Sequence, residues 1–258
     1  MRLMKRILSA AAVLALSASL LVGCSSGTAS SVPVSASSAA ESTVSSVEET
    51  ASSAVDENEA AAAQLLNDLT GSYQELWPVI LADEYKQTWL DDCTALVGEE
   101  NAEAAFEKLS SMVTSDVYGE DAVEAYANGG GAYFCGFTNS LATLTFDGET
   151  STISGTDKDG NVLFSHTYHY IGMEPVHELY EFESDDADSG EFTYFFLAPD
   201  TSAETYHIEF RYGSDAEALS QYDAGEYAYW VASGISTDCD QTMIDNCIEL
   251  FCTENLAG

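Results

Sequence analysis

The side chains best placed for chemistry in this chain are His207 and Glu209, which lie two residues apart in an alternating segment. On a β-strand, side chains two residues apart point to the same face. The segment therefore has an apolar face, formed by Tyr206, Ile208, Phe210 and Tyr212, and a polar face, formed by Thr205, His207, Glu209 and Arg211. An imidazole and a carboxylate on a face that is free for chemistry could belong to the first shell of a metal ion. The same alternation is also typical of a half-buried strand with a solvated outer face.

The residues after this segment predict how it ends. Ser214 and Glu217 have the S-x-x-E spacing of a capping box, so we expect the strand to end at Gly213 and a helix to begin at once. An aromatic loop follows and could cover one end of the fold; it carries Tyr222, Tyr227, Tyr229 and Trp230.

A series of short alternating segments precedes this strand. Turn-forming residues such as Asp147-Gly148 separate them. We expect strands at 142–146, 150–154, 162–170, 179–183, 192–197 and 205–212. Six or so short antiparallel strands indicate a barrel or a sandwich, and we favour a barrel because closure removes exposed edges and leaves a lumen.

Segments with apolar residues at helical spacing lie before and after these strands, so the predicted fold class is α+β and mainly β. We expect two helices between residue 61 and Trp89, broken around Thr70-Gly71 and at Pro78. Further helices are expected at 101–114, 216–221 and 242–254.

The first residues have the pattern of a secretory leader. Arg2, Lys5 and Arg6 precede a short apolar run, which is too short and wrongly flanked for a membrane-spanning helix. Leu21-Val22-Gly23-Cys24 resembles the lipobox of bacterial lipoproteins. The resemblance implies removal of 1–23, acylation of Cys24 by a diacylglycerol thioether, and anchoring to the outer face of the bacterial cytoplasmic membrane or in the periplasm.

Composition then separates a tether from a folded domain. Residues 24–60 are rich in Ser, Ala, Thr, Val and Glu and contain no aromatic residue. Such a segment cannot bury enough apolar area to offset its ordering entropy, so we expect a disordered tether there and one folded domain over 61–258.

The charge of the chain limits its partners. It has 44 acidic and 7 basic residues, which gives a formal net charge of −37. Three of the cations lie in the leader, so the processed chain keeps 4 cations and 44 acids and has a charge near −40. This charge would repel phosphate backbones and anionic headgroups, which argues against nucleic-acid binding and against membrane binding other than through the lipid anchor. It would attract cations, or it could serve solubility alone.

The order of predicted elements, with Ala198-Pro199 and His207-x-x-x-x-Tyr212-Gly213-Ser214-Asp215, resembles the ZinT family of zinc- and cadmium-binding periplasmic proteins. This family also forms the second domain of some zinc-importer lipoproteins. The resemblance covers roughly residues 65–258. It implies a calycin-like (lipocalin-like) antiparallel β-barrel with flanking N- and C-terminal helices, a divalent metal ion such as Zn²⁺ as ligand, and a metal ABC importer as partner.

The family holds its metal on three histidines, and the resemblance carries over one of them. His207 matches one histidine, while Thr205 and Phe195 or Phe196 stand at the other two positions. A zinc site needs three or four donors, so other residues would have to complete it. Glu209 is the best second ligand, and weaker candidates are Thr205, Glu181 and Glu183.

The remaining histidines and cysteines are less well placed as ligands. His166 and His169 have an odd spacing, so on a strand they face opposite ways, and His177 lies in a loop and is free to move. Besides Cys24 there are five cysteines, an odd number with no C-x-x-C motif. We expect core thiols, among which one disulfide could form.

Two functions remain open from the sequence. The first is a lipid-anchored, zinc-type metal-binding protein for uptake or buffering. The alternative is a metal-free barrel that binds a small molecule or a surface protein through its aromatic loop. We do not expect an enzyme, because G-x-S-x-G, H-E-x-x-H and P-loop motifs are absent from the sequence.

Overall fold

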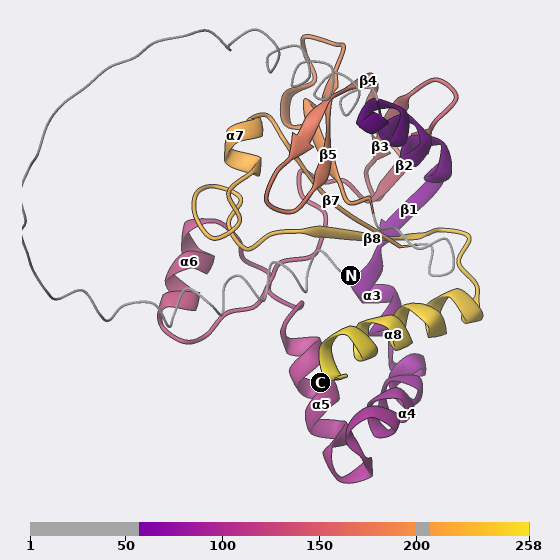
Figure 1. Cartoon of the computed structure of the whole chain (residues 1–258), viewed down its shortest axis with the longest axis vertical. Coiled ribbons are helices and arrows are strands. Elements are labelled where there is room, and N and C mark those ends of the chain that lie inside the picture. The colour runs from indigo at the N-terminus through magenta and orange to yellow at the C-terminus, as the bar shows by residue number, and fades with distance from the viewer. Residues whose placement is uncertain (1–56, 200–206, 258) are drawn as a thin grey trace, which may run out of the picture.

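The computed structural model describes residues 57–199 and 207–257. Eight antiparallel strands form one closed barrel, in which each strand pairs with the next and β1 pairs with β8 (Figure 1). The strands are β1 Gly71–Glu75, β2 Thr143–Asp147, β3 Thr152–Thr156, β4 Val162–Glu174, β5 Leu179–Ser184, β6 Tyr194–Leu197, β7 His207–Gly213 and β8 Ala232–Ser236. This confirms the predicted antiparallel barrel with flanking helices. The leader with Cys24, most of the tether, and Thr205 lie outside the described residues.

Two of the eight strands differ from the expectation. Gly71–Glu75, expected within or between helices, forms β1, and Ala232–Ser236, for which no strand was predicted, forms β8. Both are short, and they pair with each other from Tyr73 with Ser236 to Glu75 with Gly234. Their pairing closes the barrel, so the two ends of the folded chain complete the sheet between them.

Aromatic rings fill the interior of the barrel. The Phe164 ring on β4 lies 5.9 Å from the Phe195 ring on β6, so the contact passes over the intervening strand β5. The Tyr168 ring, also on β4, contacts Phe195 with centroids 5.4 Å apart. Such contacts between non-neighbouring strands form on the concave face, so this is the inner face. The expected open lumen is therefore occupied by packed side chains.

Helices gather at one side of the barrel, where α3, α4, α5 and α8 lie together (Figure 1). Residues 57–68 are helical, and the other helices are α3 Leu76–Ile80, η2 Asp83–Tyr85, α4 Lys86–Val97, α5 Glu99–Ser111, α6 Glu120–Ala127, η3 Gly190–Phe192, α7 Ala216–Leu219 and α8 Gln241–Leu256. None of the helices in the described part of the chain is both long and apolar enough to cross a membrane.

The last helix, α8, forms as its apolar stripe predicts. Asp240 caps its N-terminus by accepting a hydrogen bond from the Met243 N–H at 3.0 Å. Its buried side chains recur at helical spacing: Ile244, Cys247, Ile248, Phe251 and Cys252. Phe251 contacts the rings of Trp77 and Trp89, with centroids 4.8 and 5.9 Å away. These rings join α3, α4 and α8 into one helical layer.

The short helix α7 begins at Ala216, as predicted, but its capping residue is not the predicted Ser214. Its cap is Asp215, whose carboxylate accepts the Ala218 N–H at 3.1 Å. The Ser214 hydroxyl instead contacts the carboxylate of Glu191, 3.4 Å away. The predicted strand-to-helix transition is confirmed, but the predicted capping residue is wrong because Asp215 accepts the bond.

The predicted turn at Asp147-Gly148 joins β2 to β3, and the helix before β1 lies against it. A Cβ on Gly148 would come within 2.4 Å of the Asn67 Cα. The Gly148 N–H also donates to the Thr70 hydroxyl at 3.0 Å. The close approach of two backbones therefore requires glycine at this turn.

Candidate functional site

The predicted ligand pair lies on strand β7. His207 and Glu209 share one face of the strand, as expected, while Ile208 and Phe210 point to the aromatic interior. All seven residues of β7 are buried, and His207 and Glu209 are only 1% and 2% exposed. The expectation of a polar face free for chemistry is therefore wrong, because other parts of the fold cover the outer wall of the barrel here.

The surroundings of the pair affect its protonation and that of two thiols. Burial lowers the pKa of His207 well below its usual value, so its imidazole is neutral, the form that binds metals. Burial raises the pKa of Cys247 to about 12, and the charge of Glu209 adds to this shift. Burial and Glu209 raise the pKa of Cys135 in the same way. The Glu209 carboxylate thus lies near the thiols of Cys135 and Cys247.

The other predicted ligands are not brought to this pair. The strand register places Glu181 on β5 opposite Phe196 on β6, and Phe196 opposite Arg211 on β7. Glu181 is therefore level with Arg211. Glu183 accepts a hydrogen bond from the Tyr194 hydroxyl at 3.1 Å. Within the described part of the chain, no group of three His, Cys, Asp or Glu side chains is arranged to hold a metal ion.

Two further histidines take separate carboxylate partners. The His166 Nδ1 lies 2.7 Å from a carboxylate oxygen of Asp186, and the His169 Nδ1 lies 2.7 Å from one of Asp185. This arrangement agrees with the prediction that the two imidazoles face opposite ways. The His169 side chain is 52% exposed, so it is a useful surface control for metal binding.

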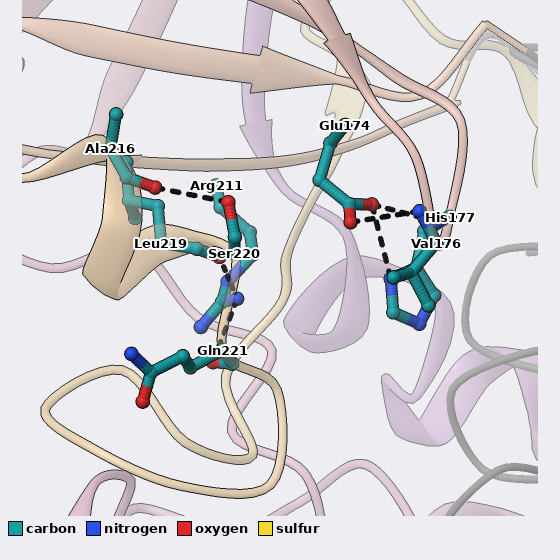
Figure 2. Close-up of polar contacts among 8 residues, drawn as sticks. All are labelled: Glu174, Val176, His177, Arg211, Ala216, Leu219, Ser220 and Gln221. Atoms are coloured by element: carbon teal, nitrogen blue, oxygen red, sulfur yellow. Dashed lines mark hydrogen bonds and ion pairs between the residues drawn. The ribbon is translucent and has the colours of Figure 1, made fainter.

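A second polar cluster, which was not predicted, lies at the connection between β4 and β5 (Figure 2). The Glu174 carboxylate is buried and accepts the N–H groups of Val176 at 2.9 Å and His177 at 2.7 Å. The His177 Nδ1 lies 3.3 Å from the same carboxylate, and its ring centroid is 3.8 Å from that of Tyr222. His177, expected to be free to move, is therefore held in place, because its neighbours bury it.

Arg211 completes this cluster from β7. Its guanidinium lies over the Tyr222 ring, 4.3 Å from the centroid, and is fully buried. It donates hydrogen bonds to the carbonyls of Leu219 and Gln221 (Figure 2). It also donates to the carbonyl of Tyr227. The guanidinium thus fastens the segment after α7 to the barrel wall. A signal for this role was present, since Arg211 is the only arginine outside the leader.

Acid should weaken the fold through Glu174. Burial acts to raise the pKa of this carboxyl, but hydrogen bonds from the His177 side chain and from the backbone of His177 and Val176 outweigh burial and lower the pKa. A lowered pKa stabilises the folded state above the unfolded pKa of about 4.3, and this contribution is lost as pH falls through the folded value. We expect the free energy of unfolding to fall less steeply between pH 5 and pH 3 in Glu174→Gln than in the wild type. Urea denaturation at each pH measures this free energy.

The matched control is Glu149→Gln, which changes an exposed carboxylate in the turn between β2 and β3. This variant should keep the acid dependence of the wild type. Equal slopes for the wild type and Glu174→Gln would contradict the assigned role of Glu174.

The aromatic loop is not an exposed rim. Tyr222, Tyr227, Tyr229 and Trp230 are all buried. The Trp230 indole N–H donates to the Gly136 carbonyl at 2.9 Å. The expectation that these rings present a binding surface is therefore wrong, because they pack into the fold.

A pocket of about 320 Å³ lies elsewhere, between α3 and two connecting segments. Its lining is mainly apolar and consists of Glu75, Trp77, Pro78, Leu81, Val113, Thr114, Ser115, Phe134, Cys135 and Gly136. A pocket of this size and lining suits a small, largely apolar molecule.

Two solved structures are similar to this one. The first is the Zn(II)-bound ZinT-like domain of AdcA from Streptococcus pneumoniae, with 16% identity and a TM-score of 0.44 over 71% of this chain and 89% of that chain. The second is Zn(II)-bound AdcA from Streptococcus pneumoniae, with 14% identity and a TM-score of 0.42 over 72% of this chain and 35% of that chain. No family model and no curated protein sequence matches this chain.

Proposed function

We propose that this protein is a non-enzymatic, lipid-anchored binding protein for a divalent metal ion of the zinc type. Acylated Cys24 would hold it at the outer face of the bacterial cytoplasmic membrane or in the periplasm, and residues 24–60 would tether the domain 61–258. The metal is cargo for uptake or buffering, and a metal ABC importer would be the recipient. The resemblance of the 198–219 stretch to the ZinT family supports this assignment.

The observation that carries the proposal is the pair His207 and Glu209. The two side chains lie on one face of β7, in a rigid strand, and the imidazole is neutral. A neutral nitrogen and a carboxylate are both donors that zinc accepts. The strongly acidic chain would also raise the local concentration of cations around the domain.

The described donors make at most an incomplete shell. Two protein ligands are fewer than the three or four of usual zinc sites, so we expect weaker binding than in the three-histidine family site. Weaker binding suits cargo that has to be released. Of the weaker ligands, Thr205, which lies outside the described residues, stays proposed.

Zinc titration of the purified protein tests this function. We expect zinc to raise the melting temperature by about 5–10 °C at a hundred times its dissociation constant, which corresponds to about 2.7 kcal/mol. Because both ligands are buried, the samples need to reach equilibrium before the scan. His207→Ala and Glu209→Gln should each lose most of this shift, and calorimetry should show the same loss of affinity.

The control is His169→Ala, which removes an exposed imidazole beside Asp185. It should keep the shift, since surface His–Asp pairs bind zinc only weakly. An unchanged shift in His207→Ala would contradict His207 as a ligand, and the absence of a shift in the wild type would contradict the metal function. The alternative of a metal-free barrel would then stand, with the 320 Å³ pocket as its ligand site.

A further inference from the structure

We propose that Cys93 on α4 and Cys252 on α8 form a disulfide bond when the chain folds outside the cytoplasm. Their sulfur atoms lie 3.9 Å apart, although the residues are 159 positions apart in the chain. Both side chains are fully buried, and α4 packs along α8 (Figure 1). The sulfurs have to approach by about 2 Å to reach a bond length of ~2.05 Å. The oxidising location rests on the lipoprotein assignment made above.

The geometry selects this pair among five cysteines. Cys93 and Cys252 are the one pair of cysteines in direct sulfur contact within the described residues. Cys247 and Cys252 are five residues apart on α8, which rotates their directions by about 140°. Cys247 therefore lies toward the barrel wall near Glu209, while Cys252 faces α4. A bond between Cys93 and Cys252 would leave three of the five cysteines as free thiols.

The chemistry is thiol–disulfide exchange with a disulfide-bearing oxidant of the extracytoplasmic space. The thiolate of one cysteine attacks the oxidant, which forms a mixed disulfide and releases one oxidant thiol. The second cysteine then attacks the mixed disulfide, which closes the Cys93–Cys252 bond and releases the other oxidant thiol. Two protein thiols are oxidised, and one oxidant disulfide is reduced to two thiols.

Burial decides when this reaction takes place. Both side chains are shielded from solvent in the folded protein, and burial raises the pKa of both thiols. The attacking thiolate is therefore scarce once α8 has docked on α4. We expect the bond to form while the helices assemble, and to resist reductants afterwards.

The bond would link α4, which precedes β2 in the chain, to α8, which follows β8. The loop that it closes contains all strands from β2 to β8, so the unfolded chain loses much conformational freedom. We expect the oxidised protein to melt about 5–15 °C above the reduced protein.

Peptide mapping tests the pairing directly. The full chain is exported with its own leader, denatured, alkylated without reduction, and cleaved after Asp and Glu. Cleavage at Glu249 separates Cys252 from Cys247, and cleavage at Asp240 separates Cys247 from Cys239. We expect a Cys93 peptide linked to a Cys252 peptide, two hydrogens lighter than their sum. Alkylation of all five thiols, or a bond between other cysteines, would overturn the proposal.

Two serine variants add a matched comparison on one helix. Cys252→Ser should lose the linked peptide and the difference in melting temperature between oxidised and reduced protein. Cys247→Ser, which is buried in the same helix, should keep both. If Cys252→Ser does not fold, the wild-type peptide map still decides the question.

The result can be separated from the proposed metal function and location. The mapping needs no metal, and neither cysteine is a proposed metal ligand. Refolding of reduced protein with glutathione disulfide tests the geometry without export. The linked peptide in this reaction supports the pairing even if zinc does not bind, and its absence there contradicts it.

Discussion

Replacing Arg211 with methionine should lower the free energy of unfolding by about 3–5 kcal/mol. Methionine can fill much of the space of the side chain but cannot donate hydrogen bonds. The carbonyls of Leu219, Gln221 and Tyr227 would lose a charged donor in a buried place. Each unsatisfied buried carbonyl costs about 1–3 kcal/mol, with part of the loss recovered where water reaches it.

Urea denaturation at neutral pH measures this change. The free energy of unfolding of Arg211→Lys should lie between those of the wild type and Arg211→Met. An ammonium group keeps the charge but lacks the planar guanidinium geometry that reaches three carbonyls at once. Lys108→Ala, at an exposed position of α5, should change stability by less than about 0.5 kcal/mol. A loss below about 1 kcal/mol in Arg211→Met would show that the guanidinium does not fasten the segment after α7.

Replacing Trp89 with alanine should cost about 3–5 kcal/mol, the usual range for deleting a buried large aromatic side chain. Trp89 is fully buried in the helical layer, where its ring lies 5.6 Å from Phe106 and 5.9 Å from Phe251. Its indole N–H donates to the Ile80 carbonyl at 2.7 Å. Alanine would leave a cavity and an unsatisfied carbonyl between α3, α4 and α8.

Trp89→Phe separates these two contributions, because it retains most of the ring and loses the hydrogen bond. We expect it to cost about 1–2 kcal/mol, measured by the same urea denaturation. If Trp89→Ala were as stable as Trp89→Phe, the packing of this ring would not be a main source of stability in the helical layer.

Local patterns in the sequence determined much of the barrel and the last helix. The alternation around Phe164 and Phe210 placed apolar side chains on one face of each segment, and closure of the barrel turns those faces inward, where both rings contact Phe195. The stripe from Ile244 to Cys252 likewise predicted α8 within two residues at each end. These elements are long and periodic, so their own side chains specify them.

The strands that close the barrel could not be predicted in this way. Gly71–Glu75 has only Tyr73 fully buried, and Ala232–Ser236 contains a glycine and two serines. Neither segment has a strong strand pattern of its own. Each becomes a strand because the other supplies its hydrogen-bonding edge, and this partner is more than 150 residues away.

The candidate sites show the same division. The sequence by itself determined that His207, Glu209 and Arg211 share one face, because side chains on a strand alternate. Only the tertiary structure decided that this face is covered, that Arg211 holds three distant carbonyls, and that Cys93 meets Cys252. The physical reason is that periodicity sets the direction of a side chain within its own element. The packing of other elements sets what it meets there.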